Sequence, residues 1–212
     1  ALVALMHNGE VCDMKTFQCP KVHKSFEERL TDLIAKIGEN MNLRRAAMLE
    51  VSNGVIASYV HNACKPNLGK IGVLVALESN GDKAKLQELG KHIAMHVAAS
   101  NPQFLTIADV DQASIDHEKA IFSEQAKASG KPENIIEKMV EGRIKKYFDE
   151  VVLEEQAYIM DPDKKVKQIV ADAAKEMGAD IKLKAFVCFR LGEGLEKRNE
   201  DFAAEVASQL KK

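Results

Sequence analysis

The sequence has few aromatic residues, no tryptophan and no marked excess of either charge sign. Aromatic residues make up only 5% of its 212 residues, too few to supply the exposed rings on which single-stranded bases stack. The 30 basic and 32 acidic residues leave a formal net charge of −2, whereas a protein that neutralises many phosphates has a strong basic excess. Composition and charge therefore both argue against a nucleic-acid-binding protein.

Long apolar runs and a dense set of cysteines are missing as well. No apolar run approaches the roughly 20 residues that cross a bilayer. Four cysteines are sparse for this length and favour a reducing, cytoplasmic compartment; they are Cys12, Cys19, Cys64 and Cys188. The chain starts at Ala1 rather than Met, in an apolar stretch without the basic lead of a signal peptide, so we expect the natural start upstream.

The first hundred residues have the pattern of an antiparallel sheet covered by helices. Ser25 opens a helix through a capping box, and Gly38 ends it. Asn53-Gly54 is a strong hairpin signal, because both residues tolerate positive φ. A second helix over 83–100 is expected to cover the sheet. The three strands of the predicted meander are 43–51, 55–61 and 71–77.

We expect a domain boundary at Asn101, where an Asn-Pro pair breaks the helical pattern. One predicted domain then covers 1–100 and the other 101–212, in keeping with a length that suits one or two domains. The second domain begins with two helices, because Asp111 can cap one and Pro132 is placed to start the next.

The rest of the second domain repeats the order of helix, turn and strand. Asp161 restarts a helix that Gly178 ends, a strand follows over 181–191, and Asn199 caps a terminal helix. Gly178 and Gly38 occupy equivalent places, since each ends a helix and precedes a short turn and an apolar strand. This echo suggests two related α/β halves.

Signals for catalysis are weak. The sequence has neither the glycine-rich loop that cradles phosphates nor the Gly-x-Ser-x-Gly elbow of a nucleophilic serine. The Gly192-Glu193-Gly194 segment lacks the third glycine of a dinucleotide loop and is interpreted as a turn. Two acidic pairs flank predicted helix starts and are expected to cap them: Asp109 with Asp111, and Asp161 with Asp163. We therefore predict no catalytic residues and no enzymatic activity.

Two groups of side chains contain metal-ligand types. His92 and His96 share a helix face, but Ile93 stands where a zinc peptidase has its glutamate base, so one half-buried and one surface histidine are expected. The gaps in the second group are wrong for a zinc knuckle, and its members are His7, Cys12, Cys19 and His23. We predict no metal and no cofactor, and a metalloprotein using the second group stays the weaker alternative.

The helix that starts at Pro132 carries more apolar residues than a lone surface helix needs. It packs either against its own return segment in a helical hairpin or against a partner or second copy of the chain. In the second case Ile136 and Met139 are the residues expected at the dimer contact. A structural or dimerising interaction module is thus one possible function.

Several stretches resemble the bacterial elongation factor Ts family. Residues 37–45 (IGENMNLRR) are similar to the family's IGENxxxRR segment, and residues 92–99 (HIAMHVAA) are similar to its HIAMHVAA helix. Residues 129–132 (SGKP) with 137–143 (EKMVEGR) resemble its SGKP…EKMVEGR stretch, and 192–196 (GEGLE) its VGEGIE ending. The stretches are long, lie in the family's order and are spread over most of the chain.

The resemblance implies a guanine nucleotide exchange factor that binds elongation factor Tu in its GDP-bound and nucleotide-free forms. The implied fold class is α+β, with two α/β subdomains whose antiparallel three-stranded sheets are covered by helices. A helical coiled-coil hairpin over about 132–161 is expected as an insertion in the second subdomain. Such a factor needs no catalytic group, because it only stabilises a partner conformation that holds GDP poorly.

The resemblance also implies contact residues. The turn after the first helix is expected to contact the GTPase domain of elongation factor Tu, through Ile37, Gly38, Glu39 and Asn40. His61, at the end of the family's SYxH strand, is expected to do likewise. Ile159 and Met160 lie in the segment expected to touch the partner's third domain. Each has a structural alternative: Gly38 as a helix cap, His61 as an ordinary strand-end residue, and Ile159 and Met160 as core.

Two departures from the family pattern bear on activity. The family's amino-terminal three-helix module and its Thr-Asp-Phe-Val segment, which reaches the magnesium site, are absent and expected upstream of Ala1. The chain as given is therefore expected to keep part of the contact surface and to exchange nucleotide weakly. The segment between Tyr59 and Lys70, which contains Cys64, is expected to be a loop longer than the family's compact hairpin.

Overall fold

The computed structural model describes residues 23–127 and 132–194 of the chain. The chain forms two compact units, residues 1–50 and 51–212. The predicted domain boundary at Asn101 lies within the second unit and stays a prediction. Among the described residues, no helix is both long and apolar enough to cross a bilayer.

The first unit contains the predicted capped helix, α2 (Phe26–Ile37). Ser25 Oγ accepts a hydrogen bond from the Glu28 amide at 3.1 Å, and a Glu28 carboxylate oxygen accepts one from the Ser25 amide at 2.6 Å. Gly38 ends the helix at φ 78°, the left-handed conformation that a residue without Cβ adopts without strain. Both predicted ends of this helix are confirmed.

The predicted strand over 43–51 is wrong, because residues 38–51 form neither helix nor strand. The predicted hairpin turn at Asn53-Gly54 is also wrong, and the glycine there has a steric role instead. Gly54 has φ 151° and starts the next strand, where a Cβ would lie 2.0 Å from the backbone oxygen of Leu77. Glycine is thus required there for close approach to the neighbouring strand rather than for a tight turn.

The sheet of the second unit is antiparallel, with strand order β1-β2-β5. Strand β1 (Gly54–Lys65) pairs with β2 (Leu68–Glu78), so the expected loop before Lys70 consists of two strand ends and a short turn. Strand β5 (Lys182–Arg190) confirms the strand predicted over 181–191. It pairs with the other edge of β2. The third strand therefore comes from the C-terminal half of the chain rather than from a meander.

The described fold is mixed α+β, with this three-stranded sheet and a separate two-stranded one. The smaller sheet pairs β3 (Ala157–Tyr158) with β4 (Asp161–Lys165). Asp161 and Asp163 lie in β4, so the predictions that Asp161 restarts a helix and that this acidic pair caps one are wrong. Helix α6 (Val166–Met177) begins later, where the Gln168 side chain accepts a hydrogen bond from the Lys165 amide at 2.7 Å.

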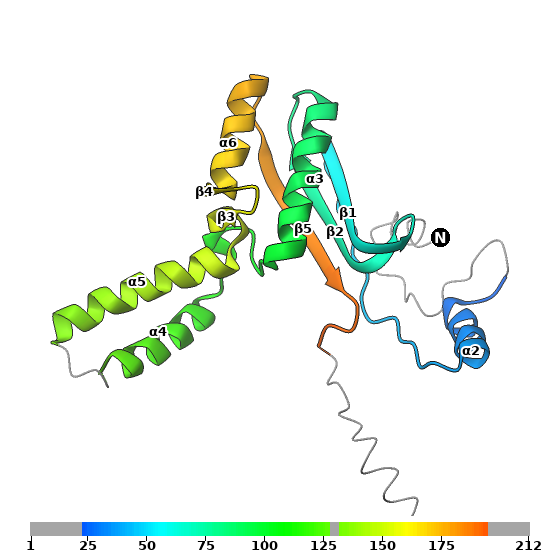
Figure 1. Cartoon of the computed structure of the whole chain (residues 1–212), viewed down its shortest axis with the longest axis horizontal. Coiled ribbons are helices and arrows are strands. Elements are labelled where there is room, and N and C mark those ends of the chain that lie inside the picture. The colour runs from blue at the N-terminus through cyan, green and yellow to red at the C-terminus, as the bar shows by residue number, and fades with distance from the viewer. Residues whose placement is uncertain (1–22, 128–131, 195–212) are drawn as a thin grey trace, which may run out of the picture. The chain divides into compact units, whose positions relative to one another are not determined.

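Helix α3 (Lys83–Ser100) covers one face of the three-stranded sheet, as predicted, and α6 packs beside it (Figure 1). Gly90 allows close contact, since a Cβ there would lie 2.6 Å from the Ala57 Cβ of β1. The core between these layers is aliphatic, and its fully buried large side chains include Val75, Leu77, Leu86, Ile93, Val97, Leu153 and Val166.

The helical hairpin consists of α4 (Gln112–Lys127) and α5 (Glu133–Val151), which lie side by side in Figure 1. Its expected range of about 132–161 is therefore wrong: the partner of the Pro132 helix precedes it in sequence. The predicted return segment, which follows α5, forms a short 3₁₀ helix, η2 (Leu153–Glu155), and strand β3 instead of a long helix. Four backbone hydrogen bonds close the base of the hairpin, and the two shortest run from Gln103 N to Val151 O and from Leu153 N to Phe104 O, both at 2.8 Å.

Two mid-helix glycines provide a matched test of this packing. Replacing Gly142 by Ala in α5, where a Cβ meets nothing within 4 Å, should stabilise the protein by about 0.5–1 kcal/mol through helix propensity. Gly90→Ala has the same propensity gain but drives a methyl into Ala57, so a net loss of about 1–3 kcal/mol is expected. Urea unfolding measures both; equal shifts would contradict the close α3–sheet contact.

Candidate partner-binding site

The turn between β3 and β4 carries two exposed apolar side chains, Ile159 and Met160, which we call the tip. Ile159 is 41% exposed and Met160 is 47% exposed, so the alternative that they are core residues is wrong. Two of the three residues just before them are buried, with Gln156 only 4% and Tyr158 only 5% exposed, while Ala157 is exposed. The exposed apolar tip therefore stands on a largely buried base.

His96 on α3 lies directly beneath the tip and is fully buried. Its Nδ1 accepts a hydrogen bond from the Ile159 amide at 3.3 Å. Because Nδ1 is the acceptor, the ring proton is on Nε2, which donates to Gln156 Oε1 at 2.9 Å. The Tyr158 ring lies against the histidine, with 5.8 Å between ring centroids. The expectation of one half-buried and one surface histidine is thus wrong, because His96 is buried and His92 is half-buried.

Gln156 is held as firmly as the histidine. Its side-chain nitrogen donates to the backbone oxygen of Glu150 at 2.7 Å and to that of Ser100 at 3.5 Å. Residue 150 lies in the last turn of α5 and residue 100 ends α3, so one amide group joins both helices to the segment before β3. No buried side-chain N or O atom of the described residues lacks a hydrogen-bond partner, which is what a rigid base requires.

An ionic network reinforces the same region from outside. Lys165 Nζ lies 2.8 Å from an Asp149 oxygen and 2.7 Å from a Glu155 oxygen, and Lys167 Nζ lies 2.6 Å from the other Glu155 oxygen. These hydrogen bonds lower the pKa of the Glu155 carboxyl below its usual range. The network joins the end of α5 to η2, β4 and α6 around the tip.

His61 lies near the exposed end of β1 and is solvent-accessible. Its Nδ1 is hydrogen-bonded to the Tyr59 hydroxyl at 3.1 Å, and the two side chains share one face of the strand. The same face further along the strand bears Val55 and Ala57, which are buried in the core. His61 is therefore an oriented polar group at the open end of the face that α3 covers.

The predicted turn after the first helix lies in the first unit, and its four residues are all exposed: Ile37, Gly38, Glu39 and Asn40. Ile37 is 54% exposed and Leu33, one turn earlier on the same helix face, is 45% exposed. A Cβ at Gly38 would meet nothing within 4 Å, so the glycine is needed for its positive φ and the surface around it is open. The cap and the contact interpretations of Gly38 are compatible.

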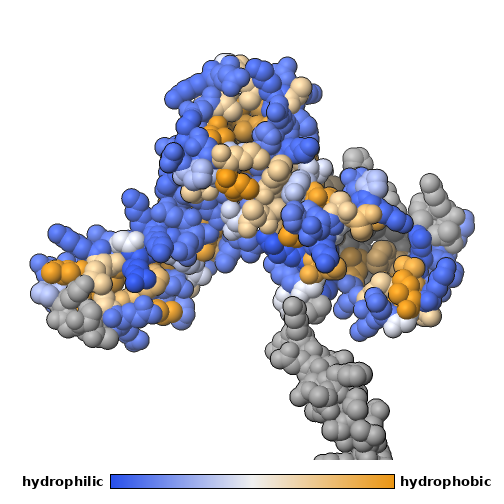
Figure 2. Space-filling view, viewed as in Figure 1, coloured by the Kyte–Doolittle hydropathy of each residue, from blue (hydrophilic) through white to orange (hydrophobic). Residues whose placement is uncertain are grey.

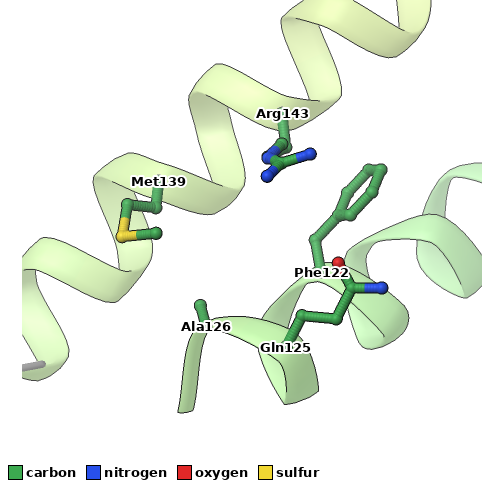
Figure 3. Close-up of a pocket in the computed structure, with 5 residues that line it drawn as sticks. All are labelled: Phe122, Gln125, Ala126, Met139 and Arg143. Carbon is green, nitrogen blue, oxygen red and sulfur yellow. The ribbon is translucent and has the colours of Figure 1, made fainter. Parts of the chain in front are cut away.

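Ile136 and Met139 are both half-buried on α5. Figure 3 shows Met139 and Arg143 of α5 directed toward Phe122, Gln125 and Ala126 of α4, and these five residues line a small gap between the helices. Arg143 lies 5.9 Å from the centroid of the Phe122 ring. Met139 thus packs within its own hairpin, the simpler of the two interpretations of this helix.

Figure 2 shows a mostly hydrophilic surface interrupted by small apolar groups, one of them in the part of the second unit formed by α3 and α6.

The described residues contain no cluster of three or more side chains that could hold a metal. Three members of the weaker alternative metal group, His7, Cys12 and Cys19, lie outside the described residues, as does the predicted terminal helix at Asn199. Gln156 is the residue that sequence reasoning missed.

Comparisons with known proteins agree on one family. A family model described as elongation factor TS matches residues 2–193. The chain is 53% identical to elongation factor Ts of Rhodospirillum centenum over 206 residues, covering 97% of this chain and 67% of that protein. It is 54% identical to that of Rhodospirillum rubrum over 213 residues (100% and 69%), and 58% identical to that of Caulobacter vibrioides over 185 residues (87% and 59%).

Burial of His96 predicts a specific loss of stability in acid. Burial holds its pKa below the usual 6.5, although the Gln156 hydrogen bond opposes this. Below pH 6.5 the unfolded chain therefore binds the proton more readily than the folded one, and stability falls as pH falls. Between pH 7.5 and 5.5, urea unfolding should show a larger loss of stability for the wild type than for His96→Asn. Equal losses would contradict a buried neutral histidine.

Met139→Asp tests which surface the hairpin uses. A carboxylate facing Phe122 and Ala126 should separate α4 from α5 and reduce helix content in circular dichroism, with the molar mass from light scattering unchanged. Lys138→Asp, at the exposed neighbouring position, is the control and should change neither quantity. A dimer that Met139→Asp dissociates would instead support the dimerising module.

Proposed function

The chain belongs to the elongation factor Ts family, and from this premise we propose which of its surfaces contacts elongation factor Tu. Members of this family are nucleotide exchange factors for elongation factor Tu in translation elongation, and they are not enzymes. The observation that carries this function is the family match over residues 2–193. The relatives are bacterial, and bacterial translation takes place in the cytoplasm, the compartment that the sparse cysteines favour.

Two separate contacts are proposed in the second unit, namely the tip and His61. Two exposed apolar side chains on a buried, hydrogen-bonded base can enter an apolar pocket of a partner with little loss of conformational entropy. His61 adds a polar group whose ring is oriented by Tyr59. Interfaces of this kind draw most of their binding energy from a few such anchors.

The proposed contact surface in the first unit is the turn formed by Ile37, Gly38, Glu39 and Asn40. The apolar pair Leu33 and Ile37 is exposed on the helix face that leads into this turn. The left-handed Gly38 reverses the chain, and its missing side chain leaves the backbone open to a partner. This surface and His61 are proposed for the GTPase domain of elongation factor Tu, and the tip is proposed for its third domain.

Exchange follows from such contacts by linkage. A factor that binds the nucleotide-free form of the GTPase more tightly than the GDP form weakens GDP binding by the same ratio. Each tenfold of that ratio corresponds to about 1.4 kcal/mol of differential binding. Apolar contacts and backbone groups can supply this difference, so the lack of a catalytic constellation in the sequence agrees with the proposed mechanism.

The tip can be tested against a matched control. Ile159→Ala combined with Met160→Ala should raise the Kd for nucleotide-free elongation factor Tu by roughly tenfold or more, because anchor side chains are lost from the contact. The release of labelled GDP that the chain stimulates should slow in parallel. Ile135→Ala removes an isoleucine of similar exposure, 43%, from α5 and should leave both quantities unchanged.

Three outcomes separate the possibilities. A higher Kd for the tip variant, with an unchanged Kd for Ile135→Ala, supports the proposed surface. Equal Kd values for wild type, tip variant and control would remove the tip from the interface while leaving the family function intact. Failure of the wild-type chain to bind elongation factor Tu at micromolar concentration would contradict the proposed function itself.

A further inference from the structure

We propose that His96 is a positioning residue for the interaction with elongation factor Tu, acting through the tip that it holds from below. This inference rests on the proposed function of Ile159 and Met160. His96 is fully buried and touches no partner itself, so any effect on binding has to pass through the tip.

The two ring nitrogens form hydrogen bonds to the base of the tip turn and to its first residue. Nδ1 accepts from the backbone amide of Ile159, the first tip residue, and Nε2 donates to the side chain of Gln156, three residues earlier. One rigid ring therefore sets the spacing between the base of the turn and its apex. Without it, the Ile159 amide would lose its acceptor and the turn could take other conformations.

Tyr158 extends this control to the second tip residue. Its ring packs against that of His96, and its hydroxyl donates to the Met160 sulfur at 3.4 Å. The backbone of Ile159 and the side chain of Met160 are thus both fixed from the same buried ring. The opposite side of the ring system is fixed as well, because Gln156 is bound to the backbone at the ends of α3 and α5.

This arrangement supplies pre-organisation. An apolar tip that already holds its bound conformation loses less entropy on binding than a mobile one. A purely structural role would require only that the buried ring fill space and satisfy its own polar atoms. A positioning role requires in addition that the Nδ1 acceptor, which faces the tip, matter more for binding than the Nε2 donor, which faces the scaffold.

Two substitutions separate the two nitrogens. His96→Asn can place an amide oxygen near the Nδ1 site and keep an acceptor for the Ile159 amide, whereas His96→Gln reaches the Nε2 site and leaves that amide without one. Both remove the ring and should lower the stability of the fold to a similar extent. The affinity of each full-length variant for nucleotide-free elongation factor Tu is the deciding measurement.

We expect His96→Gln to weaken binding roughly three- to tenfold, the range for loss of one hydrogen bond, and His96→Asn to stay within about twofold of wild type. In a chain that already carries Ile159→Ala and Met160→Ala, His96→Gln should have no further effect, since there is no tip left to position. Both results together support the proposal, because loss of stability alone would give neither.

The outcomes that overturn it are distinct from failure of the proposed function. If the tip variant binds normally, the contact surface is wrong. If the tip variant binds weakly but His96→Gln and His96→Asn weaken binding equally, or His96→Gln adds its full effect to the tip variant, His96 has only a structural role. Should His96→Gln not fold, amide hydrogen exchange of the wild type decides: an Ile159 amide that exchanges at an unprotected rate overturns the proposal.

Discussion

The buried hydrogen bond between His96 and Gln156 is the interaction on which the tip and the elements around it depend. It joins the middle of the sequence, on α3, to the segment that leaves the helical hairpin. Burial makes this bond obligatory, because either group left unpaired would cost about 1–3 kcal/mol. The tip, the two-stranded sheet and the base of the hairpin all take their positions from residues that this pair touches.

The tip and the hairpin differ in how firmly they are attached. The tip lies on a base with buried hydrogen bonds and an ionic network around Lys165 and Glu155. The hairpin is joined to the rest of the unit mainly at its base, through backbone hydrogen bonds beside Phe104 and Leu153. A contact that must hold a partner in one conformation needs a rigid support, and the tip that we propose for this contact lies on such a support.

The ends of single helices were predicted well from the sequence, whereas the pairing of strands distant in sequence was not. The ends of α2 and α3 follow from Ser25, Gly38 and the helical period, all within one short window. The position of β5 beside β2 depends on residues about a hundred positions apart, which no local pattern encodes. Gly54 illustrates the same limit. The Asn-Gly pair is typical of a hairpin turn, but the glycine is needed here because β1 approaches the backbone of Leu77 closely.

The candidate site shows a similar division. The family motifs supplied the tip, the turn after α2 and His61, whereas the base beneath the tip came only from the structure. His96 was noted only as one of two histidines on a helix face, and its full burial was not predicted, while Gln156 carries no sequence signal. A buried amide becomes recognisable only when its partners from three elements are brought together.

The most direct test of this account is hydrogen–deuterium exchange of the whole chain, alone and bound to nucleotide-free elongation factor Tu. The account predicts that binding slows exchange at the tip and its flanking residues 157–161, at residues 37–40 and around His61, and leaves α4 and α5 unchanged. Protection confined to α4 and α5, with the tip unaffected, would contradict it.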